Sequence, residues 1–238
     1  MSVKPKEKEA LPKKYRHEQK YYICQADHEI ISRRLSLSME RDRYADENGE
    51  YFIRSLYFDD ANDSAFRDKL DGVDSRDKYR LRTYNLTDKT IKLEKKHKDG
   101  QYIQKSSISL NRKEADDLIA GRYGFLLSRP EPFAREMFAT FTTRQLRPKV
   151  IVDYVREAYV FPVQDVRVTF DKEIRTGFRN TDIFDAELPT YPVLSSGDMV
   201  MEVKFNLYLP TYIRSLIQLP AEVRSAVSKY CICRKFEL

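Results

Sequence analysis

The stretch YRLRTYN at residues 79–85, followed by IKLEKKHKDG at 91–100, decides which folds this chain can adopt. Side chains of a β-strand alternate between two faces, and the residue types in both stretches alternate in the same way. Arg80 and Arg82 share one face of the first stretch, and Lys96 lies on the charged face of the second. A half-buried strand normally turns apolar residues to the core, so a face made of cations needs an explanation.

The same alternation recurs along the chain, so that at least five predicted strands share a cationic face with scattered carboxylates. Besides the arginines and Lys96, the residues on this face are Arg16, Glu18, Lys20, Lys92, Glu94, Arg167, Thr169, Asp171, Glu202 and Lys204. The exposed face of an antiparallel sheet would account for any one of these strands. The repetition favours a sheet that closes into a barrel, with the cations inside.

Clustered cations repel one another, and removing them from water is expensive. A barrel lined in this way therefore requires a wet interior that binds a polyanion. Its apolar outer face would be covered by the helices that the sequence predicts at 27–37, 111–127 and 132–145. We expect an α+β fold, a closed antiparallel β-barrel or tunnel of about eight strands with helices packed outside.

Composition agrees with a polyanionic partner, since the 238 residues carry a net charge of +6 and the pI is about 9.0. We expect residues 1–14 to be a disordered basic lead-in and residues 15–238 to form a single domain. Three cysteines without zinc-site spacing predict reduced thiols and a cytoplasmic protein. No apolar run approaches the roughly 20 residues of a membrane-spanning helix, so any translocation across a membrane would need a partner protein.

Eight stretches, in their order and spacing, resemble the vacuolar transporter chaperone (VTC) domain family of the triphosphate tunnel metalloenzyme superfamily. They are RHEQKYYI, SLYFDD, YRLRTYN, IKLEKKHK, VDYVREAY, VRVTFDKEIR, VMEVKFN and VSKY, and the resemblance covers about residues 15–235. It implies a tunnel whose basic side chains bind a triphosphate or a growing polyphosphate chain. The phosphate ligands that it implies, for binding and for catalysis, are Lys20, Arg80, Arg82, Lys96, Arg156, Arg167 and Lys229. Glu202 would be the ligand of a Mn²⁺ or Mg²⁺ ion.

Some positions stay open at this stage. Arg54 lies near an arginine of the family's second strand, but the local spacing does not align the two. Glu94 and Lys204 point the same way as the implied ligands, and the role of Glu18 is undecided. The hydrolases of the superfamily often begin with Glu-x-Glu-x-Lys, whereas this chain has Arg16 at the position of the first glutamate.

The resemblance implies a metal-dependent phosphotransferase, a polyphosphate polymerase that moves the γ-phosphate of a nucleoside triphosphate, expected to be ATP, onto inorganic polyphosphate. The loss of one carboxylate at Arg16 favours this over a two-metal hydrolase. Two alternatives remain: a tunnel-fold triphosphatase with the same ligands, and a non-catalytic module that binds polyphosphate or RNA. An RNA-binding sheet would stack bases on exposed aromatic residues, for which Tyr79, Tyr84, Tyr154 and Tyr159 are available. Carboxylates among the cations indicate a metal instead, so nucleic acid is the less expected partner.

Overall fold

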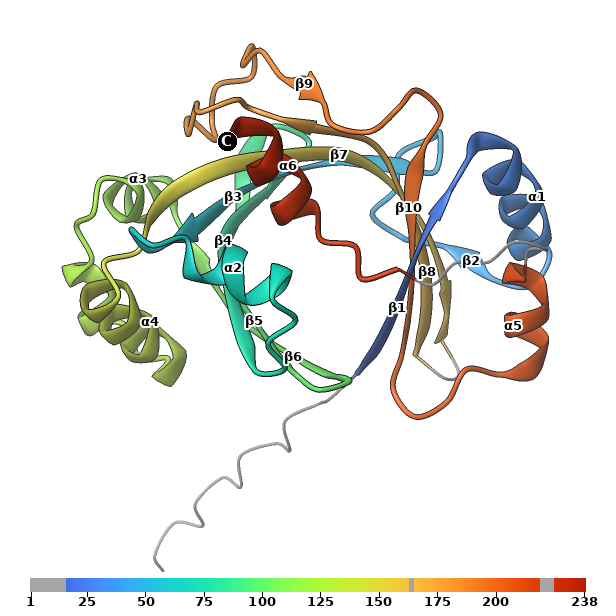
Figure 1. The fold of residues 1–238 in the computed structure, drawn as a ribbon, viewed down its shortest axis with the longest axis horizontal. Coiled ribbons are helices and arrows are strands. Elements are labelled where there is room, and N and C mark those ends of the chain that lie inside the picture. The colour runs from blue at the N-terminus through green and yellow to red at the C-terminus, as the bar shows by residue number, and fades with distance from the viewer. Residues whose placement is uncertain (1–15, 163–164, 219–224) are drawn as a thin grey trace, which may run out of the picture.

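The computed structural model describes residues 16–162, 165–218 and 225–238, so the expected lead-in at 1–14 lies outside the described residues. In chain order, the elements are β1 (His17–Ile23), α1 (Gln25–Ser36), β2 (Glu40–Arg41), β3 (Glu50–Asp59), α2 (Ser64–Leu70), β4 (Arg76–Tyr84), β5 (Thr87–Asp99), β6 (Tyr102–Leu110), α3 (Arg112–Ile119), the 3-10 helix η1 (Gly124–Ser128), α4 (Pro132–Thr143), β7 (Arg147–Phe161), β8 (Val166–Thr176), β9 (Tyr191–Pro192), β10 (Met199–Phe205), α5 (Thr211–Ile217) and α6 (Lys229–Glu237). All strands described belong to one antiparallel sheet, which curves strongly around a concave face (Figure 1).

The expected closed barrel is wrong, because the sheet is open. Its main path of eight strands runs in the order β1-β10-β8-β7-β3-β4-β5-β6, with β2 beside β7 and β9 beside β8. The two end strands, β1 and β6, approach each other without forming a ladder. They are joined by an isolated bridge, in which Arg16 and Ile103 each donate a backbone hydrogen bond of 3.2 Å to the other.

The free edge of β1 finds a different partner beyond that bridge. The backbone N–H of Ser225, in the segment before α6, donates to the carbonyl of Lys20 at 2.9 Å. A buried strand edge needs partners for its backbone groups, and here the C-terminal segment supplies one in place of β6. The seam between β1 and β6 therefore stays open over most of its length.

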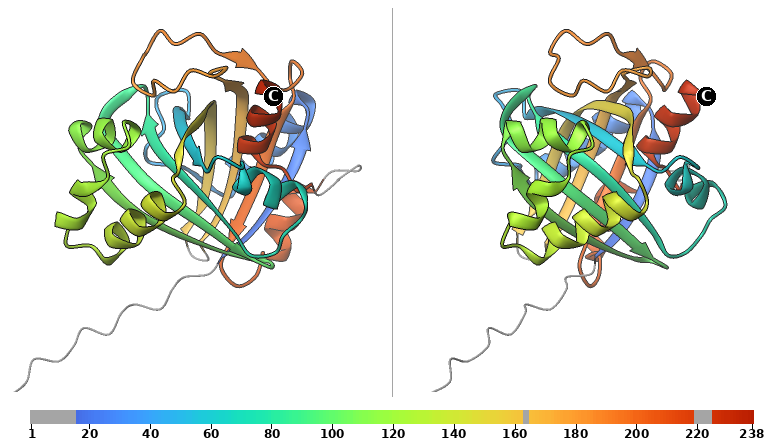
Figure 2. Two further views of the ribbon diagram at one scale, coloured as in Figure 1. Left: turned by 60° about the vertical axis from the view of Figure 1, so that its left-hand side comes forward. Right: turned by 90° about the vertical axis from the view of Figure 1, so that its left-hand side faces the viewer.

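Helices cover the convex face of the sheet in two groups (Figure 2). Leu118 of α3, Leu126 of η1 and Met137 of α4 pack on Leu81 and Leu93 from the outer faces of β4 and β5. The outer faces of β1, β8 and β10 are covered in the same way by α1 and α5. Burial of these apolar faces is what stabilises the curved sheet, and it leaves the concave face free for polar side chains.

One end of the concave face is filled by a third apolar cluster. Tyr230 and Cys233 of α6 lie there, with Phe66 of α2 and with Val152 and Tyr154 of β7. The end of α6 that enters this space begins at Ser228, whose hydroxyl accepts from the backbone N–H of Cys231 at 3.3 Å. This cap sets the position of the next residue, Lys229, on the concave side.

None of the helices in the described part of the chain has the length and apolar character needed to span a membrane.

Candidate functional site

Three adjoining cavities follow the concave face. The central cavity has a volume of about 80 Å³ and lies between two wider ones. We name these the α2 cavity, of about 380 Å³, and the Arg167 cavity, of about 530 Å³. Glu18 and Lys96 line all three, so the cavities lie next to one another, and we call this series of cavities the path.

Every side chain that the sequence predicted as a phosphate or metal ligand lines this path. The central cavity is bordered by Lys20, Arg80, Arg82, Lys96, Arg156, Glu202 and Lys229. Arg167 lies apart from this group and borders the Arg167 cavity, together with Arg80, Arg82 and Arg156. Side-chain parity thus brings residues from six strands to this path, and the first residue of α6 adds Lys229.

Glu202 is the hub of the central cavity. Its carboxylate accepts from Lys229 at 2.8 Å and from Lys204 at 2.7 Å, and it pairs with Lys20 at 3.0 Å. Strand register explains the last contact, because Lys20 of β1 lies directly opposite Glu202 of β10. Burial raises the pKa of Glu202, but the surrounding lysines outweigh burial and hold the pKa well below its usual range.

The arginines of β4 differ in how they are held. Arg80 donates to Glu94 at 2.8 Å and to the hydroxyl of Tyr57, also at 2.8 Å. Arg82 is buried and donates to Ser55 at 3.1 Å and to the hydroxyl of Tyr154 at 2.8 Å, without a carboxylate partner among the described residues. Its guanidinium group is therefore the less compensated of the two.

Asp171 holds two further ligands in place. Arg156 donates to it in the two-pronged geometry of a guanidinium–carboxylate pair, at 2.6 and 2.8 Å, and Lys229 also pairs with it. Asp171 lies on the inner face of β8 and is fully buried. The sequence placed it on the cationic face but did not assign it this bracing role.

Arg167 stands nearer to solvent than the other ligands, with 32% of its side chain exposed. It pairs with Asp42, in the loop after β2, and donates to the hydroxyl of Tyr51 at 2.7 Å. The predicted ligands therefore fall into a group around the central cavity, of which Arg82, Arg156, Glu202 and Lys229 are buried, and one arginine in the Arg167 cavity.

The structure shows where the four residues lie whose roles the sequence left open. Arg54 points to the outer face of β3, where Nη2 donates to buried Asp153 at 2.8 Å. Glu18, Glu94 and Lys204 all line the central cavity. Arg54 is thus a structural residue, because β3 presents alternate residues to the cavity and Ser55, not Arg54, faces it.

Three tyrosines of the central cavity escaped the sequence analysis as parts of the site. The ring of Tyr154 lies 5.2 Å from the guanidinium carbon of Arg156 and 5.0 Å from Nζ of Lys229. Tyr57 stacks on Tyr230, with their ring centroids 5.1 Å apart. Aromatic faces attract cations and separate them sterically, which helps to explain how so many cations pack together. Tyr57 and Tyr154 lie at strand positions whose side chains point into the cavity, so the alternation in the sequence could have identified them as part of the site.

The central cavity remains strongly cationic after all pairing. Eight lysine and arginine side chains line it, against three glutamates. Burial lowers the pKa of Lys96 to about 8, although Glu18 opposes that change. An anion in the cavity would gain from this field.

A divalent cation fits this donor set only in part. No three Asp, Glu, His or Cys side chains in the described part of the chain gather in a way that could hold a metal ion by themselves. Both oxygens of Glu202 already contact ammonium groups. One carboxylate such as Glu202 is compatible with a hard divalent cation only if phosphate oxygens and waters would supply the remaining ligands.

Comparison with known proteins supplies the family. The sequence model of the VTC domain matches residues 15–237. No curated protein sequence matches the chain significantly. Among solved structures, a Hippeastrum protein, described as a candidate adenylyl cyclase with a dominant triphosphatase activity, has a TM-score of 0.55 at 15% identity, covering 94% of this chain and 97% of its own. A candidate adenylate cyclase from Bacillus halodurans has a TM-score of 0.50 at 12% identity, covering 90% and 96%. These likenesses show a shared fold, and the chain belongs to the VTC domain family.

Proposed function

We propose that this protein is a polyphosphate polymerase, which transfers the γ-phosphate of ATP, or of another nucleoside triphosphate, onto inorganic polyphosphate. The observation that carries the proposal is the narrow central cavity, whose lining is eight cations and three glutamates and which opens into a wider space on each side. A phosphate chain is narrow and anionic along its whole length, and a donor and an acceptor could meet in such a cavity from opposite ends.

The roles of the residues follow from phosphoryl-transfer chemistry, in which the protein mainly positions the substrate and neutralises its charge. Arg80, Arg82 and Arg156 would donate to non-bridging oxygens of the donor, since guanidinium groups bind phosphate in two-pronged fashion. Lys20, Lys96 and Lys229 would add mobile positive charge. Arg167 would contact phosphates that lie in the Arg167 cavity.

The reaction itself balances without a strong base. A terminal oxygen of the polyphosphate attacks the γ-phosphorus of ATP, the bond from that phosphorus to the β–γ bridging oxygen breaks, and ADP leaves. One P–O–P linkage forms for each one broken. The attacking oxygen is already ionised, so the site needs no residue to remove a proton.

Glu202 would hold the divalent cation, Mn²⁺ or Mg²⁺, together with phosphate oxygens. When bound, the ion would neutralise charge on the β- and γ-phosphates. Lys204 contacts one carboxylate oxygen of Glu202 and Lys229 contacts the other, so at least one of these contacts would have to break when the ion binds. The phosphates that arrive with the ion offer these lysines new partners.

Triphosphate hydrolysis is the second candidate function, because the Hippeastrum protein of similar fold is described as having a dominant triphosphatase activity. The two reactions differ in the acceptor, which is water or a phosphate chain end. We prefer the polymerase because Arg16, directly before β1, is a cation that lines the Arg167 cavity, where a second carboxylate would favour two metal ions.

RNA binding has less support than either reaction. Of the four tyrosines considered for stacking, Tyr79, Tyr154 and Tyr159 are at most 2% exposed. Bases need open aromatic faces, and these rings are buried in the fold. We therefore retain triphosphate and polyphosphate as the proposed ligands.

The cellular setting belongs to the same proposal. We place the protein in the cytoplasm, with ATP at hand, and Cys24, Cys231 and Cys233 are free thiols as a reducing compartment favours.

Incubation of the purified protein with ATP and Mn²⁺ tests the proposal. We expect chains that a polyphosphate-specific phosphatase degrades, and Arg82→Gln should lower their formation by about ten- to a hundredfold through loss of a charge-assisted contact. Arg33→Gln, which removes an exposed charge outside the cavities, should leave it unchanged. Free phosphate as the product would support the hydrolase, and no turnover of ATP would refute both.

A further inference from the structure

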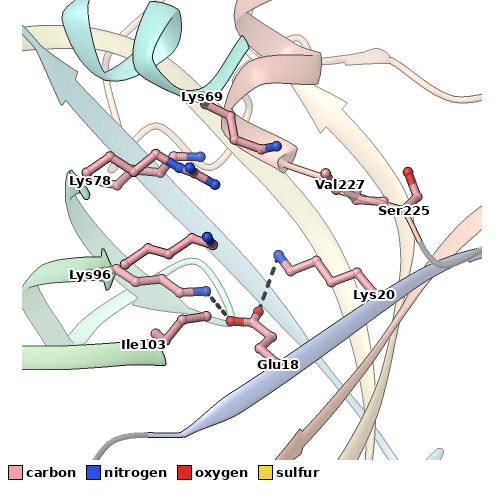
Figure 3. A pocket seen from close by; sticks show the side chains of 11 residues that line it. Glu18, Lys20, Lys69, Lys78, Lys96, Ile103, Ser225 and Val227 are labelled. Atoms are coloured by element: carbon pink, nitrogen blue, oxygen red, sulfur yellow. Dashed lines mark hydrogen bonds and ion pairs between the residues drawn. The ribbon is translucent and has the colours of Figure 1, made fainter. Parts of the chain in front are cut away.

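The α2 cavity has a cationic lining, part of which has no role in the proposed reaction. Its charged lining, among the described residues, is six cations and one carboxylate. Four of these cations, which we call the α2 mouth, are Lys69, Arg76, Lys78 and Lys98. They come from α2 and from the adjoining ends of β4 and β5, and Lys69 and Lys78 point into the same space as Lys20 and Lys96 (Figure 3).

The cations of the α2 mouth form no ion pair with a carboxylate within the described residues. Lys78 donates to the hydroxyl of Ser228 at 2.5 Å. Arg76 and Lys98 donate to backbone carbonyls, those of Val73 and Gly100. The central cavity differs, since most of its cations have a carboxylate within ion-pair distance. Charge in the α2 mouth is therefore left for a ligand to compensate.

The lowered pKa values of these cations also indicate positive charge that a ligand could compensate. Burial, with repulsion from Lys20, Lys96 and Lys69, lowers the pKa of Lys78 to about 7. The pKa values of Lys69 and Lys98 are also lowered, by burial and then by Arg76. Cations whose pKa is lowered by mutual repulsion gain most when an anion comes between them.

The opposite end of the path has a different character. In the Arg167 cavity, Arg167 pairs with Asp42 and Lys105 pairs with Glu94. Tyr51 and Tyr84 also line that cavity, with their ring centroids 6.2 Å apart. Aromatic rings and compensated charges suit a nucleoside better than a chain of phosphates. An all-phosphate ligand longer than the narrow cavity has its better continuation on the α2 side.

We propose that the α2 mouth is a second phosphate-binding site, which takes the phosphates of a linear polyphosphate that extend beyond the central cavity. This inference rests on the proposed function. It adds that affinity rises with chain length because of these four cations, and that the chain lies toward α2 while the nucleoside of the donor lies toward Tyr84.

Binding measurements with two probes test the inference. The variant K69Q/R76Q/K98Q keeps Lys78, which also borders the central cavity. We expect its affinity for a longer linear polyphosphate to fall by about tenfold or more, because charge-assisted contacts are lost. Affinity for tripolyphosphate, which we place at the central cavity, should change by less than about threefold. The affinity for the longer chain should also depend less steeply on salt concentration, since fewer counterions are released.

The control variant is R33Q/K89Q/K113Q, which removes the same charge from exposed positions outside the cavities. It should bind both probes like the wild type. Equal losses in the two triple variants would overturn the inference, because net charge alone would then explain the effect. A matching loss for tripolyphosphate would overturn it too, since the α2 mouth would then be part of the triphosphate site. Failure of the wild type to bind tripolyphosphate would refute the proposed function, and this extension with it.

Discussion

Compensating carboxylates are the residue-scale reason why this cationic face can exist without a ligand. Asp171 braces Arg156 and Lys229, and Glu94 braces Arg80. The alternation in the sequence correctly placed the cations on one face, but it could not show which of them would find an acid on a neighbouring strand, as Arg80 does at Glu94 and Arg156 does at Asp171.

Glu202 gives the sharpest test at this scale. In Glu202→Gln the amide is a poor ligand for a divalent cation, so Mn²⁺ should no longer bind together with tripolyphosphate. We also expect a loss of stability of about 1–3 kcal/mol, because three lysines lose their shared anion. Electron paramagnetic resonance of free Mn²⁺ measures the first effect, and chemical denaturation measures the second.

The control for this variant is Glu94→Gln, which removes a carboxylate of the same cavity that pairs with Arg80 and Lys105. It should lose stability but keep Mn²⁺ binding in the presence of tripolyphosphate. Wild type should bind no Mn²⁺ when tripolyphosphate is absent, because Glu202 is then occupied by lysines. Equal Mn²⁺ binding by the two variants would remove Glu202 as the metal ligand.

Lys78 should make polyphosphate binding depend on pH. The groups that face its ammonium are Lys20 from β1, Lys69 from α2, Lys96 from β5, and Ser228, Tyr230 and Cys231 from the α6 segment. Its pKa of about 7 means that the free protein loses this proton as the pH rises through 7, whereas a bound polyanion favours the protonated form. Affinity should therefore fall between about pH 6 and pH 9.

Titration calorimetry at several pH values measures this effect, and Lys78→Gln should make the profile shallower, leaving the contribution of Lys96, whose pKa is about 8. Lys113→Gln, on an exposed helix position, should retain the slope of the wild type. A Lys78→Gln profile as steep as that of the wild type would show that other groups bind the proton.

At the scale of elements, the pleat of β3 and β4 separates binding residues from structural ones. Arg82 faces the cavity, and Arg54 faces outward and forms a buried pair with Asp153. We expect Arg82→Gln to lower tripolyphosphate affinity by about ten- to a hundredfold with little change in stability. Arg54→Ala should do the reverse and cost about 3–5 kcal/mol of stability, because it leaves Asp153 buried and unpaired. Calorimetry and denaturation of both variants check this; a loss of affinity without a loss of stability in Arg54→Ala would contradict it.

The elements themselves were largely predictable. The helices expected at 27–37 and 132–145 correspond to α1 and α4, within a few residues at each end. The helix expected at 111–127 is instead the short helix α3 and the 3-10 helix η1. Asn111 does cap α3, by accepting from the backbone N–H of Glu114 at 2.9 Å. Helix caps and strand alternation depend on residues that are neighbours in the chain, which is why the sequence could predict these elements.

The arrangement of the whole molecule was less predictable, and closure of the sheet was the error. Alternation fixes which face a residue occupies, but closure depends on hydrogen bonds between β1 and β6, which are far apart in the chain. The backbone N–H of Ser225 donates to the carbonyl of Lys20 at the edge of β1, and the residues around either position do not predict this contact. The open seam is bridged on the concave side by the ion pair between Glu18 of β1 and Lys96 of β5.

A ligand bound to both sides of this seam should tighten it. Tripolyphosphate that contacts Lys20 and Lys96 would join β1 to β5, so the edge amides of β1 and β6 should exchange more slowly, since they open locally. Amides of α3 and α4, remote from the cavities, should be unaffected. Hydrogen-exchange mass spectrometry measures both regions, and equal protection in the two would argue against binding across the seam.

The central claim, that the γ-phosphate passes to a phosphate chain, is tested most directly by the fate of that phosphate. Purified protein is given ATP labelled in the γ-phosphate, with Mn²⁺ and a short polyphosphate acceptor, and ADP, free phosphate and labelled chains are counted separately. The account predicts that each ADP formed is matched by one labelled phosphate in a chain, and that a polyphosphate-specific phosphatase releases this label. One free labelled phosphate for each ADP, with unlabelled chains, would contradict the account and identify water as the acceptor.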